Sequence, residues 1–87
     1  PLKVSIVSAN PMNNDLLRLN FSNEEQSIVS VNITDLEGKV IMELMNEYVG
    51  SESIVKEFNI NDLKSGTYFI SATDDTNKTT TKFIIAE

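Results

Sequence analysis

Side chains able to carry chemistry are few in this sequence, and two of the most versatile types are missing. The chain of 87 residues contains no cysteine and no histidine. Zinc sites of the usual kinds need thiolate or imidazole ligands, and Ser-His and Cys-His nucleophile pairs need an imidazole base. Histidine is also the commonest general acid or base near neutral pH. The composition therefore predicts a protein that is not an enzyme, with no catalytic residue, no metal site and no cofactor.

Carboxylates and amides gather at three places where they could act together. Glu24 and Glu25 are adjacent in a polar stretch, and segments 13–15 and 74–77 combine Asn, Asp and Thr side chains. Oxygens of these types bind calcium, but neither segment has the alternating acidic positions and glycine of a calcium loop. Asn and Asp side chains also bond readily to nearby backbone. We therefore interpret all three as turns or polar loop tips, and no metal is predicted.

The overall charge argues against two classes of partner. The formal net charge is −6 at pH 7, so the chain lacks the basic footprint that binds phosphate backbones or anionic lipid surfaces. No apolar run approaches the roughly 20 residues that a membrane helix requires. We expect no nucleic acid partner and no membrane-spanning segment. The start at Pro1 fits a module taken from a longer protein, in which any leader peptide would lie upstream.

Short alternating segments separated by turn residues run through the whole sequence. Alternation of apolar and polar residues is typical of half-buried strands, and its clearest case is Val29, Val31 and Ile33. Further strands are expected near residues 4–6, 17–21, 40–48, 54–58, 67–73 and 78–85. Short strands with turn signals at regular intervals predict an all-β fold, an immunoglobulin-like antiparallel β-sandwich of about seven strands. The length fits a single domain over residues 1–87.

Two of these segments admit a second interpretation. Segment 40–48 contains good helix formers, but the glycine turn at 35–39 and Gly50 bracket a strand-sized piece, so a strand is favoured. Simple alternation in this strand would group Val40, Met42 and Leu44 on one face and Ile41, Glu43 and Met45 on the other. In segment 54–58, Lys56 has the parity of the apolar residues, which indicates an edge strand or a bulge.

A glycine turn leads into an aromatic strand at residues 63–70. Gly66 can adopt a positive φ without steric cost, which suits a sharp entry into the strand. Tyr68, Ile70 and Ala72 then share one face. In immunoglobulin-like sandwiches a tyrosine near the start of strand F bonds its hydroxyl to upstream backbone. Tyr68 is expected to form such a tyrosine corner, and the alternative is a half-buried tyrosine without that bond.

The last predicted strand has two distinct faces. Lys78 and Lys82 flank a run of threonines, while Phe83 and Ile85 are expected to point inward. The lysine and threonine face is either a partner-facing surface or a solubilising outer face, and the residues alone favour neither. An edge strand of this kind can recruit another chain by β-addition, which needs no pocket.

Four stretches in order resemble the type A C-terminal sorting domain of the type IX (Por) secretion system of Bacteroidetes. The resembling residues are Asn10-Pro11 with Leu16-Leu17-Arg18-Leu19, then Val31 to Val40 including Asp35-Leu36-Glu37-Gly38-Lys39, then Ile60 to Ile70 including Leu63-Lys64-Ser65-Gly66-Thr67-Tyr68, and finally Thr81-Lys82-Phe83-Ile84-Ile85. The resemblance covers nearly the whole chain.

This resemblance implies a domain fused behind a secreted or cell-surface cargo and recognised in the periplasm and at the outer membrane by the type IX secretion machinery. A sortase-like peptidase then usually removes the domain and attaches the cargo to anionic lipopolysaccharide. The resemblance carries recognition over to Gly38, Lys39, Gly66, Tyr68, Lys82 and Phe83. Among these, the glycines and Tyr68 are expected to keep the fold.

Two other functions stay open at this point. The first is an uncleaved sorting-like domain that serves a surface or machinery protein as a docking or glycolipid-binding module. The second is an accessory immunoglobulin-like module of a surface glycosidase or adhesin. A carbohydrate-binding module of that kind would expose aromatic side chains on one face, and only Phe69 and Tyr48 are candidates.

Overall fold

The computed structural model describes residues 2–8 and 15–86, and within these ranges the chain forms seven strands and no helix. The strands are β1 (Lys3–Ile6), β2 (Leu16–Ser22), β3 (Ser27–Thr34), β4 (Val40–Val49), β5 (Ile54–Asn59), β6 (Gly66–Thr73) and β7 (Lys78–Ile85). The all-β prediction is confirmed, including the strand favoured at 40–48. The turn predicted at Asn10-Pro11, and residues 13 and 14 of the next one, lie outside the described residues.

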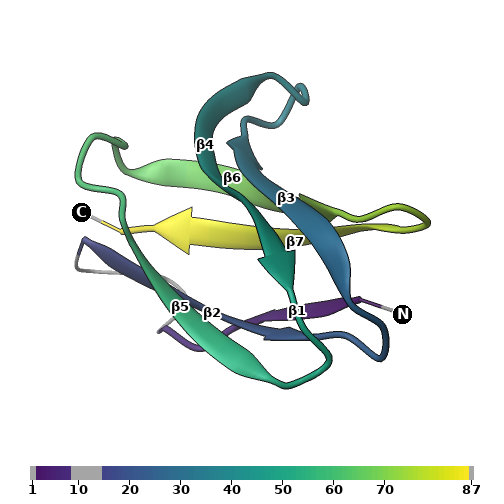
Figure 1. Ribbon diagram of the computed structural model, residues 1–87. Coiled ribbons are helices and arrows are strands. Elements are labelled where there is room, and N and C mark those ends of the chain that lie inside the picture. Colours follow the sequence, from purple (N-terminus) through teal and green to yellow (C-terminus); the bar gives the residue numbers. More distant parts are fainter. Residues whose placement is uncertain (1, 9–14, 87) are drawn as a thin grey trace.

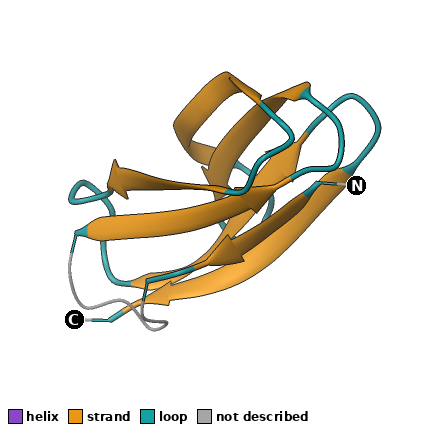
Figure 2. Ribbon diagram, turned by 60° about the horizontal axis from the view of Figure 1, so that its bottom comes forward, coloured by secondary structure: helices purple, strands orange, loops and turns teal. Residues whose placement is uncertain are grey.

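The strands form two antiparallel sheets that pack face to face (Figure 1). Sheet A has the order β1-β2-β5, and sheet B has the order β4-β3-β6-β7. The chain crosses between the sheets after β2, β4 and β5, which brings β3 beside β6 although they are far apart in sequence. Figure 2 shows only strands and connecting loops in the described part of the chain. The predicted β-sandwich is confirmed.

The core lies between the sheets and is filled mainly by alternate residues of β2, β3, β6 and β7. Side chains with no exposed area are Leu17, Leu19 and Phe21 of β2, Val29, Val31 and Ile33 of β3, Val49 of β4, Ala72 of β6, and Phe83 of β7. This is the period-two pattern expected from the sequence, and each large side chain of this kind contributes about 1.5–3 kcal/mol by leaving water. The inward face predicted for β6 is confirmed.

Strand β4 departs from simple alternation. Its register against β3 shifts twice, so that Ile41 and Leu44 have no directly paired residue on β3. Each extra residue forms a β-bulge, which reverses the parity beyond it. As a result Met45 is buried in the core, and the prediction that grouped it on the face opposite Met42 is wrong.

The bulges also bend β4 along one side of the sandwich, where it curls toward sheet A (Figure 1). The Glu47 carboxylate there lies 2.7 Å from the ammonium group of Lys56 on β5. Strand β5 is an edge of sheet A, so the edge position inferred from the parity of Lys56 is confirmed. This ion pair bridges the two sheets.

The two ends of the sandwich carry different connections. At one end, which we call the Asp74 end, Lys3 pairs with Ser22 and loop 23–26 lies close to loop 74–77. At the other, the Gly66 end, Gly66 pairs with Ile85 and the turn at 60–65 enters β6. Strand β1 therefore begins at the Asp74 end, and β7 ends at the Gly66 end (Figure 1).

Candidate recognition surface

Loop 35–39 is held in one conformation by its own hydrogen bonds. The Asp35 amide donates to the Lys39 carbonyl at 3.0 Å, and the Gly38 amide donates to the Asp35 carbonyl at 3.1 Å. One Asp35 carboxylate oxygen accepts from the amides of Glu37 and Lys39, both at 2.9 Å. Gly38 has φ +90°, which side chains disfavour. The glycine closure predicted here is confirmed, and the loop exposes Leu36, Glu37 and Lys39.

Tyr68 forms the predicted tyrosine corner. Its hydroxyl donates to the carbonyl of Lys64 at 2.7 Å, and its ring packs against Phe83 with the centroids 5.7 Å apart. Gly66 has φ +153°, and a Cβ there would meet the Tyr68 ring no closer than 3.9 Å. Glycine is therefore needed for its backbone conformation rather than for space. Together with the fully buried Phe83, these residues hold the start of β6 and the end of β7 together.

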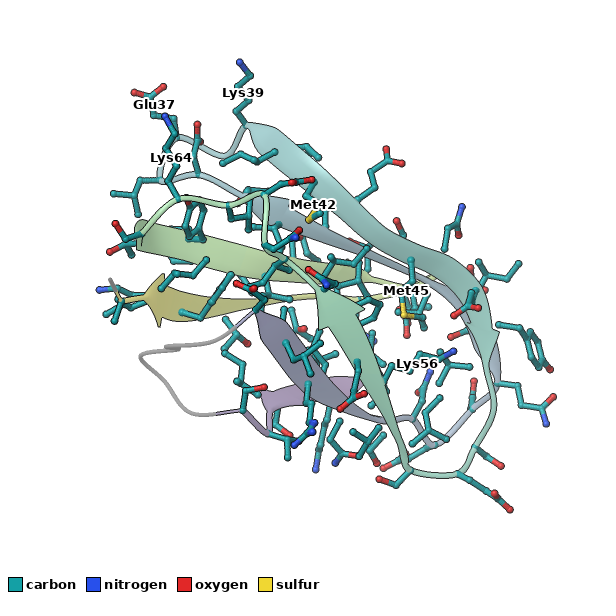
Figure 3. All side chains as sticks on the ribbon, turned by 90° about the vertical axis from the view of Figure 1, so that its left-hand side faces the viewer. Glu37, Lys39, Met42, Met45, Lys56 and Lys64 are labelled. Atoms are coloured by element: carbon teal, nitrogen blue, oxygen red, sulfur yellow. The ribbon has the colours of Figure 1, made fainter. Side chains whose placement is uncertain are left out.

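The residues singled out for recognition converge on sheet B. Tyr68 pairs with Phe83, and two positions away Gly66 pairs with Ile85. Lys82 pairs with Phe69, which in turn pairs with Thr34 at the start of loop 35–39. Figure 3 shows Glu37, Lys39 and Lys64 at the same end of the molecule. The structure thus brings Gly38, Lys39, Gly66, Tyr68, Lys82 and Phe83 together at and beside the Gly66 end.

The sequence matches the secretion system C-terminal sorting domain family over residues 9–86. The chain belongs to this family. The domain is a C-terminal sorting signal of type IX secretion, so it interacts with the type IX secretion machinery. Such a signal sends the protein that carries it across the outer membrane to the cell surface or the extracellular space. No curated protein matches the sequence.

The sorting domain family is one of targeting signals and is not known as catalytic. Within residues 2–8 and 15–86, no three acidic side chains are arranged to hold a metal ion. No helix formed by these residues is long and apolar enough to cross a membrane. Because the family acts through the type IX secretion machinery, we consider the candidate surface as a protein contact.

The sorting domain has a surface feature that the sequence did not reveal. On the outer face of sheet B, Leu36 and Gly38 of loop 35–39 border a shallow groove together with Phe69 of β6 and with Lys78 and Thr80 of β7. The alternation in β6 and β7 places the strand residues of this set on one face. It does not predict that the loop leans over them, because that position depends on contacts between segments distant in sequence.

At the Asp74 end of the sorting domain, the Asp74 side chain stabilises the turn at 74–77. One Asp74 carboxylate oxygen accepts from the amides of Thr76 at 2.9 Å and Asn77 at 2.7 Å. The Asp74 amide donates to the Asn77 carbonyl at 2.9 Å. The bonds from Thr76 and then Asn77 stabilise the carboxylate and lower the pKa of Asp74 below its ordinary 3.8. The turn interpretation of segment 74–77 is confirmed.

Proposed function

We propose that the type IX machinery reads the folded surface at the Gly66 end of sheet B, together with loop 35–39, and needs no reactive side chain. The observation that carries this proposal is the convergence of loop 35–39, the start of β6 and the end of β7 on one region. The three stretches are distant in sequence, so only the folded domain presents them together. Recognition of a folded surface gives specificity that an extended tail of the same residues would lack.

The candidate residues divide into two roles in this proposal. Lys39 and Lys82 are exposed and contact the machinery directly, while Gly38 sets the shape of the loop. Gly66, Tyr68 and Phe83 act indirectly, because they fix the strands that present the lysines. Lys39 and Lys82 are positive side chains on a chain whose net charge is −6. They favour a partner with complementary negative charge at this surface and disfavour a partner with positive charge there.

We further propose that residues 1–87 act as one domain behind an exported cargo. A sortase-like peptidase then removes the domain and joins the cargo to anionic lipopolysaccharide. Membership of the sorting family supports this sequence of events. It can be tested by the intact mass of a reporter recovered from the cell surface. Loss of the 9.7 kDa domain is expected, whereas a reporter that keeps this mass would indicate a retained docking module.

The recognition proposal is tested with a periplasmic reporter that carries residues 1–87 at its C-terminus in a host with type IX secretion. The unmodified fusion should reach the surface. The double substitution Lys39→Glu and Lys82→Glu should lower surface reporter about tenfold, which corresponds to about 1.4 kcal/mol of lost binding. The matched control is Lys3→Glu, which reverses an exposed lysine at the Asp74 end. Unfolding curves of the purified unmodified and variant domains must coincide, so that a difference in surface reporter is not caused by a difference in stability. Equal secretion of all three fusions would refute the surface assigned here.

A further inference from the structure

We propose that the groove on the outer face of sheet B docks an extended acidic segment of a type IX machinery protein, which places an aliphatic side chain beside Phe69. This inference rests on the proposed function and extends it from a region of the domain to the chemistry of the partner. It adds Leu36, Phe69, Lys78 and Thr80 to the recognition surface.

The strand register builds the floor of the groove. Residues paired across an antiparallel ladder point to the same face. Phe69 pairs with Lys82, and Ser71 pairs with Thr80. Because the intervening Ile70 is buried in the core, Phe69 and Ser71 face outward. The floor is therefore a flat surface of short hydroxyl side chains with one aromatic ring.

An apolar spot lies where loop 35–39 meets this floor. Leu36 is 64% exposed and borders the groove together with the half-buried Phe69. Thr34 and Ser71 surround the pair with hydroxyl groups. A small apolar centre within a polar rim is the usual arrangement at the energetic centre of a protein interface. An aliphatic side chain of a partner fits there.

The charges on the outer face of β6 and β7, where Lys78 lines the groove and Lys82 pairs with Phe69 beside it, specify the rest of the segment. The outward positions of β6 and β7 include Lys78 and Lys82 and, along these two described strands, no carboxylate. The two lysines are four residues apart on one face, or about 13 Å at the usual rise of a strand. Carboxylates at positions i and i+4 of an extended segment have the same spacing, and residue i+2 then points toward the sheet between them. The lysines and the apolar spot together favour an acidic peptide over a glycan.

Glu37 limits where an acidic segment can lie in the groove. It lines the loop side of the groove, where it would repel a carboxylate that approached loop 35–39. An acidic segment is therefore drawn toward β7, along the line from Lys78 to Lys82. Like charges brought close together at an interface are costly, so Glu37 helps to fix the register of the segment.

The binding experiment is an NMR titration of the isotope-labelled 87-residue domain with the capped peptide Glu-Thr-Leu-Thr-Glu. We expect shift changes centred on Leu36, Phe69 and Thr80, and weaker binding at higher salt. Two matched peptides, Gln-Thr-Leu-Thr-Gln and Glu-Thr-Ala-Thr-Glu, should each bind at least about fivefold more weakly, consistent with loss of about 1 kcal/mol. The domain variant Lys78→Glu should lose the interaction, and Lys3→Glu should keep it. Absence of binding at millimolar peptide, or shifts centred on sheet A, would overturn the proposal.

A test in cells separates this inference from the proposed function. Reporter fusions carry a photo-crosslinking amino acid in place of Leu36 or, as control, of Val55, which is exposed on sheet A. Position 36 should crosslink to an acidic segment of a machinery protein, and position 55 should not. Crosslinks from position 36 to glycan, or to a segment without carboxylates, would overturn the partner assigned here. If the unmodified fusion is not exported, the proposed function fails; if it is exported but Leu36→Ser with Lys78→Glu is exported equally well, only the present inference fails.

Discussion

Tyr68 is held at both ends of its side chain, by a hydrogen bond from its hydroxyl to the Lys64 carbonyl and by packing of its ring on Phe83. Replacing Tyr68 by Phe removes the bond and keeps the ring. We expect the free energy of unfolding to fall by about 1 kcal/mol, the usual net value of one such bond. Urea unfolding followed by circular dichroism measures the change.

The control for this substitution is Tyr48→Phe, which removes a hydroxyl that bonds to the side chain of Gln26 on an exposed face. Surface changes of this kind usually alter stability by less than about 0.5 kcal/mol. A loss at Tyr48 equal to that at Tyr68 would show that the corner has no special role.

Asp74 predicts a specific dependence of stability on pH. Its pKa is lowered in the fold by the amides of Thr76 and Asn77, so its ionised form stabilises the folded state relative to the unfolded chain. This contribution is complete above the ordinary value of 3.8 and is lost as the pH falls through the lowered pKa. Asp74→Asn should therefore melt below the unmodified domain at pH 7, and the two melting temperatures should converge in strong acid. A difference that is the same at both pH values would contradict this account.

Strand β4 shows how local periodicity can mislead while the type of element stays predictable. Met42, Met45 and Val49, which contact the core together with Leu44, follow at intervals of three and four, and this spacing resembles a helical stripe. The interval of three arises because the bulge at Leu44 shifts the strand by one residue, and the interval of four passes over Glu47, which is exposed. The flanking glycines mark out a strand-sized segment, which is enough to predict the type of element. The positions of the bulges depend on pairing with β3 and cannot be recognised from residues 40–49 alone.

For the other strands, the sequence predicted the inward faces and the tyrosine corner but not how distant segments pair. Inward faces of β2, β3, β6 and β7 follow from alternation, because these strands have one buried and one solvated face. The tyrosine corner followed from one spacing, between Tyr68 and the buried Ile70. The pairing of β3 with β6 and the position of loop 35–39 above Phe69 were not predictable. Both depend on contacts between segments that are distant in sequence.

The edges of the sheets differ in how they are protected. Strand β1 has only four residues, β4 is bulged, and β5 carries Lys56 at an inward position, bound to Glu47. These are recognised devices against pairing with another chain. Replacing Lys56 by Val should increase self-association, since the edge of β5 then becomes apolar and uncharged.

Sedimentation velocity of the purified domain tests this prediction about β5. The matched variant is Glu47→Gln, which breaks the ion pair and leaves the Lys56 charge at the edge. It should sediment like the unmodified domain. A monomeric Lys56→Val at the highest attainable concentration would show that other features protect this edge.

For the molecule as a whole, sorting and folding are inseparable in our proposal. A chain of 87 residues has a total stability of only about 4–13 kcal/mol. Phe83 is fully buried, so Phe83→Ala should cost about 3–5 kcal/mol and lower the melting temperature by roughly 15–30 °C. Thermal unfolding measures this loss, and the reporter fusion should lose export at the same time. Phe83→Leu, which keeps most of the side-chain volume, should retain both.

Normal export of an unfolded Phe83→Ala fusion would identify the linear tail as the signal instead of the folded surface. The comparison is direct because Lys82, Ile84 and Ile85 remain in the variant. The substitution changes only how β6 holds these residues in place, because it removes the packing between Phe83 and Tyr68.

The positions of the chain ends have a consequence for what the domain can transport. Residue Leu2 lies next to the Asp74 end, where Lys3 pairs with Ser22, so any polypeptide that precedes it departs on that side. Gly66 and the end of β7 lie at the opposite side, away from the point where that polypeptide joins the domain. If the machinery binds this opposite side, as we propose, one receptor geometry serves passengers of very different size, and a new passenger requires no change in the recognised surface.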